Sequence, residues 1–95
     1  MNDRQKRHLR GLAHALKPVV MIGNKGLTDT VLAEIDTALA HHELIKVKLS
    51  GADKATKQVF LDKITHQHHA VLINIVGHTA ILYRPADDPK IILPR

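Results

Sequence analysis

The stretch Val19-Val20-Met21-Ile22-Gly23-Asn24-Lys25-Gly26-Leu27-Thr28 contains the transition that decides the fold. Its first four residues are apolar and predict a short strand, apolar on both faces and therefore interior to a sheet. The two glycines that follow within four residues predict a tight loop. Thr28 is a suitable N-cap for a helix. A strand, a glycine loop and a capped helix in this order predict the start of a β-α-β unit.

The elements around this stretch continue the alternation of helices and strands. Helices are predicted at residues 3–16, 27–42 and about 54–67, and strands at residues 19–22, 44–49, 71–76 and 79–84. Helical crossovers imply parallel strands with right-handed connections. Gly77 and His78 join the last two strands and suit a type II′ hairpin. We therefore expect a single α/β domain, α-β-α-β-α-β-β, with a four-stranded mixed sheet packed with helices.

Apolar periodicity predicts the buried side of each helix, and Asp3 and Asp53 are the expected N-caps of the first and third. The buried positions are Leu9, Leu12, Ala13 and Leu16 in the first helix, Val31, Leu32, Ile35, Ala38 and Leu39 in the second, and Thr56, Val59, Phe60 and Ile64 in the third. The tail, about residues 85–95, contains three prolines and is expected to be irregular. A short edge strand is expected within it at Ile91 to Leu93.

Length and composition exclude several classes of protein. The chain has 95 residues, the size of one small domain, and no cysteine, so disulfides, thiol catalysis and thiolate metal sites are excluded. No apolar run exceeds four residues, so we expect no membrane span and no signal peptide. A cytoplasmic protein is the resulting expectation.

The net charge of +5 is distributed unevenly along the chain. Residues 1–26 hold six cations against one acid, whereas residues 27–95 hold eight of each. The six cations are Arg4, Lys6, Arg7, Arg10, Lys17 and Lys25. In the first predicted helix, Gly11 shares the basic face and would let another molecule approach the backbone closely. This excess favours a polyanionic partner, although a basic helix can also be an ordinary solvated face.

The loop Gly23-Asn24-Lys25-Gly26 has the chemistry of an anion-binding segment. A loop that opens a helix presents unpaired N–H groups, glycines admit a phosphate without a Cβ in its way, and Lys25 adds a cation. Many Gly-x-x-Gly segments are simple turns, and this one is neither a dinucleotide fingerprint nor a P-loop. Its position between an apolar strand and a capped helix, beside the basic helix, favours a functional role.

Other residue patterns limit the kind of function. Phe60 and Tyr83 are the only aromatic residues, too few for a platform that stacks single-stranded bases. The eight histidines, including the cluster His66, His68 and His69, lack the spacing of a zinc site and fit exposed positions better, where they could add charge in mild acid. No pattern of nucleophile, base and orienting group indicates an enzyme.

Three segments resemble the CRM domain (chloroplast RNA splicing and ribosome maturation), in the form of the stand-alone bacterial YhbY-like proteins. They are His8 to Thr28, His42 to Lys48, and Gly77 to Arg84, and the resemblance spans nearly the whole chain. The resemblance implies a fold similar to the C-terminal domain of translation initiation factor three. It also implies RNA binding, with the glycine loop likened to that of KH domains, and for bacterial members association with precursors of the large ribosomal subunit.

We therefore expect a non-enzymatic RNA-binding protein that acts in assembly of the large ribosomal subunit, with ribosomal RNA as its partner. The expected RNA-binding residues are Arg4, Arg7, Arg10, Lys17, Gly23, Asn24, Lys25 and Gly26, extended by Lys46 and Lys48 on one strand face. No cofactor, metal, membrane or small-molecule substrate is expected. The alternative is an interaction adaptor that docks an acidic protein partner on the basic helix.

Overall fold

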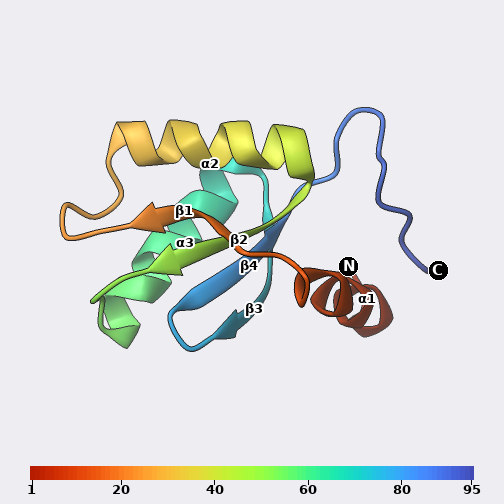
Figure 1. The fold of residues 1–95 in the computed structure, drawn as a ribbon, viewed down its shortest axis with the longest axis horizontal. Helices are drawn as coiled ribbons and strands as arrows, with labels where there is room; N and C mark the ends of the chain where they lie inside the picture. The colour runs from red at the N-terminus through yellow and green to blue at the C-terminus, as the bar shows by residue number, and fades with distance from the viewer.

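Three helices and four strands follow one another in the predicted order (Figure 1). A computed structural model describes all of residues 1–95. The elements are α1 (Asp3–Ala13), β1 (Pro18–Ile22), α2 (Asp29–His42), β2 (Leu44–Leu49), α3 (Lys54–His68), β3 (Val71–Val76) and β4 (Thr79–Tyr83). They form a single α/β domain with a four-stranded mixed sheet, as predicted. None of the helices combines the length and the apolar character that crossing a membrane requires.

The sheet has the strand order β1-β2-β4-β3. β1 and β2 are parallel, and β4 lies antiparallel between β2 and β3. The prediction that β1 is an interior strand is wrong, because β4 occupies the other side of β2 and β1 is left at the edge. Val20 and Ile22 face the core, whereas Val19 and Met21 are 51% and 56% exposed.

One face of the sheet is sealed by α2 and α3. Ile45, Val47 and Leu49 point into this layer from β2, where they join a cluster of thirteen buried residues with apolar side chains from both helices. Thr28 caps α2 as predicted, its hydroxyl accepting a hydrogen bond from the Val31 amide at 3.2 Å. This layer contains most of the hydrophobic core and therefore most of the apolar stabilisation.

The opposite face of the sheet is covered only at one end. Leu9 and Ala13 of α1 pack there against a smaller cluster of Leu44, Ile73, Ile81 and Tyr83. Leu12 and Leu16, expected to complete the buried stripe of α1, are instead 42% and 37% exposed. A short helix on half a sheet face buries a narrow stripe, and the remainder of this face stays open.

Both ends of α1 differ from the prediction. Asn2, not Asp3, is the N-cap: its side chain accepts from the Gln5 amide at 2.8 Å, and Gln5 Oε1 accepts from the Asn2 amide at 3.1 Å. This reciprocal capping box places Asp3 at the first helical position. The helix ends at Ala13 and not at residue 16, because β1 already begins at Pro18 and the chain needs residues 14–17 to turn into it.

The buried side of α3 is rotated relative to the prediction. Leu61 and Ile64 are buried and Phe60 packs against the core, whereas Val59 is 64% exposed. Asp53 caps the helix as predicted, since its carboxylate accepts from the Thr56 amide at 2.7 Å. The apolar residues of this helix follow a weak pattern, so tertiary packing decides which of them are buried.

The C-terminal tail is irregular, and the edge strand expected at Ile91 to Leu93 is absent. Glu43, 3% exposed, accepts hydrogen bonds from the amides of Ala86, Lys90 and Ile91 at 2.8–3.2 Å. The amide of Ile91, the first residue of the expected strand, is thereby unavailable to a strand ladder. Ile91 and Leu93 pack instead on the cluster beneath α1.

Candidate nucleic-acid interface

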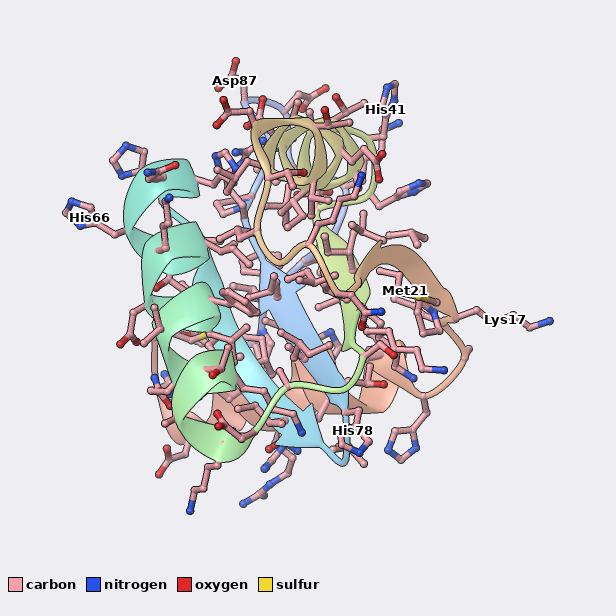
Figure 2. The ribbon with its side chains drawn as sticks, turned by 90° about the vertical axis from the view of Figure 1, so that its left-hand side faces the viewer. Lys17, Met21, His41, His66, His78 and Asp87 are labelled. Carbon is pink, nitrogen blue, oxygen red and sulfur yellow. The ribbon has the colours of Figure 1, made fainter.

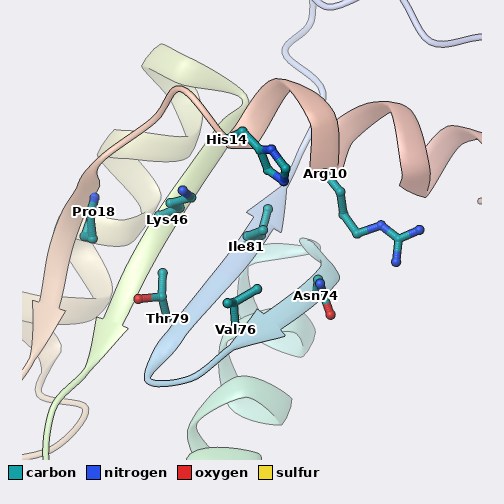
Figure 3. Close-up of a pocket in the computed structure, with 8 residues that line it drawn as sticks. All are labelled: Arg10, His14, Pro18, Lys46, Asn74, Val76, Thr79 and Ile81. Carbon is teal, nitrogen blue, oxygen red and sulfur yellow. The ribbon is translucent and has the colours of Figure 1, made fainter.

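The open part of the sheet face is polar and basic. Strand alternation places Lys46 and Lys48 of β2 on the side opposite the main core, with Lys46 half-buried and Lys48 exposed. Arg10 of α1 and His14, the residue that caps its C-terminus, overhang this face, where a hollow of about 270 Å³ lies between the helix and the strands (Figure 3). No acidic residue lines the hollow. We call this part of the sheet, with the residues of α1 that border it, the open basic face.

The α1 helix supplies one cation, Arg10, to the edge of this face. Arg7 lies three residues earlier in the helix, His14 follows Arg10 at four-residue spacing as the C-cap residue, and all three are exposed. Gly11 lies among them, and a Cβ built there would meet no atom within 4 Å. Arg4 differs from these residues, because its guanidinium lies 3.4 Å from the carbonyl oxygen of Arg95 in the tail.

The linker between α1 and β1 adds a further cation. Lys17 is exposed and extends away from the body of the protein (Figure 2). The Lys46 ammonium crosses from β2 to donate a hydrogen bond to the Leu16 carbonyl at 3.0 Å. An ammonium has three N–H donors, so Lys46 can hold the linker in place and still contact an anion.

The glycine loop is a tight turn closed by a hydrogen bond from the Gly26 amide to the Gly23 carbonyl at 3.0 Å. Gly26 has φ of +73°, and a Cβ there would lie 3.3 Å from the Phe60 ring. Gly23 has no such constraint, and a Cβ there would point into open space. The amides of Asn24 and Lys25 donate no backbone hydrogen bond, and both residues are exposed. They remain available to an external acceptor.

The sequence suggested that the loop lies beside the basic helix, but the two are far apart in the structure. They lie toward opposite ends of the longest dimension of the molecule, which measures 38 Å (Figure 1). β1 runs between them, and Lys48 of β2 pairs in register with Met21 near the loop end of the sheet. A ligand that contacts both regions must therefore be long, as a polymer is.

The acidic residues that bond within the fold do so away from this face. The only ion pair between fixed charges joins Asp36 to Arg84 at 2.7 Å, and the His68 imidazole lies 3.8 Å from the same carboxylate. The hydrogen bond from Arg84 is the main reason that the pKa of Asp36 lies below its usual value. Burial raises the pKa of Glu43, but its backbone hydrogen bonds and Lys90 outweigh this effect, and the net pKa is lowered. The expected RNA-binding cations therefore have no acidic side-chain partner.

Two polar residues of this face were missed by sequence reasoning. Asn74 of β3 and Thr79 of β4 line the hollow. Asn74 is the only polar residue in the strand Val71–Val76, and asparagine is disfavoured in strands. An asparagine in an otherwise apolar strand is the sequence signal that could have identified this residue. The histidines form no metal site, and no group of three or more potential ligands occurs. His68 instead lies 2.9 Å from the Leu32 carbonyl through its Nε2 atom.

Comparison with known proteins places these features in a family. The model of the CRS1/YhbY (CRM) domain matches residues 1–84. The chain belongs to the CRS1/YhbY (CRM) domain family. A CRM relative from Haemophilus influenzae, named RNA-binding protein, is 53% identical over 95 residues, which cover 100% of this chain and 96% of that protein. Another, named "Probable RNA-binding protein PA4753", from Pseudomonas aeruginosa, is 38% identical over 95% of this chain and 86% of its own length.

A solved structure has the same fold. The solution structure of the hypothetical protein SAV1595 from Staphylococcus aureus matches with a TM-score of 0.84 and 29% sequence identity. The match covers 99% of each chain. The names of the two curated relatives refer to RNA binding and to no enzymatic activity.

Proposed function

We propose that this protein binds RNA on its open basic face and acts in assembly of the large ribosomal subunit. The observation that carries the proposal is the run of unpaired cations from α1 across β2 toward the glycine loop. Cations without acidic partners attract a polyanion and release its counterions on binding, which is the main source of affinity for nucleic acids. The names of the CRM relatives support RNA as that polyanion.

The glycine loop is proposed as the second contact with the RNA backbone. The free amides of Asn24 and Lys25 can donate to a phosphate, and Lys25 adds a charge. Asp29 already complements the positive end of the α2 dipole, so the loop amides and Lys25 carry this contact more than the helix terminus does. Two contacts toward opposite ends of the domain favour a structured RNA recognised through backbone and shape.

The family resemblance supports precursors of the large ribosomal subunit as the source of this RNA. We place the role in the cytoplasm and assign no catalytic step to the protein. Crosslinking in cells, followed by sequencing of the bound RNA, tests the assignment. Enrichment of ribosomal RNA from large-subunit precursors is expected, and recovery of no ribosomal RNA would refute it.

A salt titration tests the proposed contact surface with a matched pair of lysine variants. Lys25→Ala should weaken binding of a structured ribosomal RNA fragment regardless of sequence and reduce the slope of log affinity against log salt by somewhat less than about one unit. Lys63→Ala removes another exposed lysine, from α3 on the far side of the sheet, and should change neither quantity. Equal effects of the two variants would exclude Lys25 from a specific contact.

The same assay distinguishes the adaptor hypothesis. The exposed apolar residues Leu12 of α1, Leu16 of the linker and Val19 of β1 line one hollow and could accept an acidic protein segment. A short acidic peptide, added as a competitor, should fail to displace the RNA at concentrations where unlabelled RNA displaces it. Displacement by the peptide at comparable concentration would favour a protein partner.

A further inference from the structure

We propose that the hollow beneath α1 is a binding pocket for the base of one unpaired RNA nucleotide, read by the side chain of Asn74. The proposal rests on the proposed RNA binding and adds base recognition to it. The scarcity of aromatic rings argues against a platform that stacks several bases, but it does not exclude a pocket that takes a single base.

The size of the hollow suits one base. Its volume of about 270 Å³ lies just below the range of roughly 300–1,000 Å³ typical of small-molecule sites. Val76, which is 62% exposed, provides apolar surface against which a planar ring can lie, Ile81 lines the hollow from the cluster under α1, and the His14 imidazole overhangs the same space (Figure 3). The hollow opens on the sheet face between α1, which carries Arg10, and β2, which carries Lys46, and a single-stranded segment can reach it there.

The charges around the hollow match the covalent structure of a nucleotide. Arg10 and Lys46 lie on either side of His14 (Figure 3). A nucleotide within a chain has a phosphate on each side of its sugar, so a base in the hollow would place one phosphate toward each cation. Neither cation is in an ion pair, and Lys46 retains two N–H donors beyond its bond to Leu16.

Asn74 provides the group that can distinguish bases. Its carboxamide offers both a donor and an acceptor, and single-stranded bases are read through just such pairs on their edges. This side chain makes no hydrogen bond within the protein and is only half-buried, so it reaches the hollow unpaired. Thr79 lines the hollow as well and adds a hydroxyl that can donate or accept. A polar residue of low strand propensity whose side chain has no partner within the protein is suited to an external one.

The test uses four hexanucleotides that carry one base, A, C, G or U, at the third position and abasic residues elsewhere. Affinity is measured by fluorescence anisotropy at low salt. We expect the protein to bind the four with affinities that differ by at least about fivefold, the lower end for a two-bond base contact. The signals of the Asn74 side-chain amide should shift on binding in a ¹H–¹⁵N spectrum.

Two pocket variants and a control complete the experiment. Asn74→Ala should make the four affinities equal, and Arg10→Ala should lower all four by one common factor. Gln67→Ala removes an exposed carboxamide from α3 behind the sealed face and should leave both affinity and preference unchanged. Thr79→Val has nearly the same shape and removes only the hydroxyl, so it should reduce the base preference as well. This second variant keeps the test valid if Asn74→Ala disturbs β3.

The outcomes separate this pocket from the proposed function. Equal binding of all four hexanucleotides by the unaltered protein, or a preference that survives in both Asn74→Ala and Thr79→Val, would overturn the pocket and leave RNA binding intact. Failure of the unaltered protein to bind the hexanucleotides and a structured ribosomal RNA fragment would overturn both proposals.

Discussion

The two faces of the sheet differ in how completely they are covered. The face under α2 and α3 is sealed by thirteen buried residues, whereas the other has a cluster of six under α1 and is otherwise open. The same strand contributes to both, since β2 alternates Ile45, Val47 and Leu49 with Lys46 and Lys48. Adjacent residues of β2 point to opposite faces of the sheet. Substitutions can therefore change the stability of the fold without changing RNA binding, and the reverse.

The largest effect is expected from opening a cavity on the sealed face. Ile35 of α2 is fully buried, and Ile35→Ala should lower the free energy of unfolding by about 2–5 kcal/mol. RNA affinity of the folded protein should stay unchanged, because Ile35 lies behind the sheet. Urea unfolding and anisotropy measure the two quantities. Ile92→Ala, at a position 85% exposed, is the matched control and should change neither.

A weakened affinity of folded Ile35→Ala would contradict the separation of the two faces. The fraction of folded protein must therefore be measured by circular dichroism under the binding conditions. Only the affinity per folded molecule bears on the comparison.

A smaller and pH-dependent effect is expected where the tail meets the cluster under α1. Glu43→Gln keeps the shape of the side chain but removes the charge that holds three backbone amides, and should cost about 1–3 kcal/mol at pH 7. The pKa of Glu43 is lowered in the folded state from its ordinary value of 4.5. Its charge therefore stabilises the fold fully above about pH 4.5, and this contribution is lost as the pH falls through the lowered pKa.

Urea unfolding at pH 7 and at about pH 3 measures this change. The difference between Glu43→Gln and the unaltered protein should shrink at the lower pH. Glu34→Gln, on the exposed side of α2, is the matched control and should have little effect at either pH. A difference for Glu43→Gln that is the same at both values would show that the charge itself does not stabilise the tail.

The smallest effect on stability separates the two glycines of the loop. Gly26→Ala should lower the free energy of unfolding by about 1–2 kcal/mol, because φ of +73° disfavours a side chain and the new Cβ would press on Phe60. Gly23→Ala should leave stability unchanged, since its Cβ would enter open space, but should weaken RNA binding if the backbone contacts a phosphate there.

Thermal unfolding and a salt-titrated RNA assay on both variants provide the comparison. Unchanged RNA affinity in Gly23→Ala would show that no phosphate approaches the backbone closely at Gly23. The contact proposed for Lys25 is tested separately by Lys25→Ala.

Much of the fold was predictable because its signals are local. Capping by Thr28 and Asp53, the alternation of β2 and the glycine at position 77 each act within a few residues, and the structure confirms all of them. Gly77 has φ of +60°, as the first position of a type II′ turn requires. The cap of α1 was misassigned by one residue, because Asn2 and Asp3 are both good N-caps and only the position of Gln5 favours the first.

The errors concern residues whose surroundings come from distant parts of the chain. β1 lies at an edge because the β3–β4 hairpin places β4 on the far side of β2, which no local pattern reveals. The tail is held differently because the buried Glu43 carboxylate, between α2 and β2, accepts from the amides of Ala86, Lys90 and Ile91, and Ile91 begins the expected strand. The loop and α1 are likewise far apart because they adjoin opposite ends of β1, and because α1 covers the face of the sheet opposite α2 and α3.

The sequence by itself determined the element order, the α/β class, the main apolar layer and the concentration of positive charge in residues 1–26, because these follow from local propensity, periodicity and composition. Only the tertiary structure decided that α1 covers half of one sheet face and leaves the rest open. The hollow exists because α1 ends at Ala13 above strands that continue beyond it. Arg10, Lys46 and Asn74 meet there from three elements far apart in the chain, and only the folded sheet brings them together.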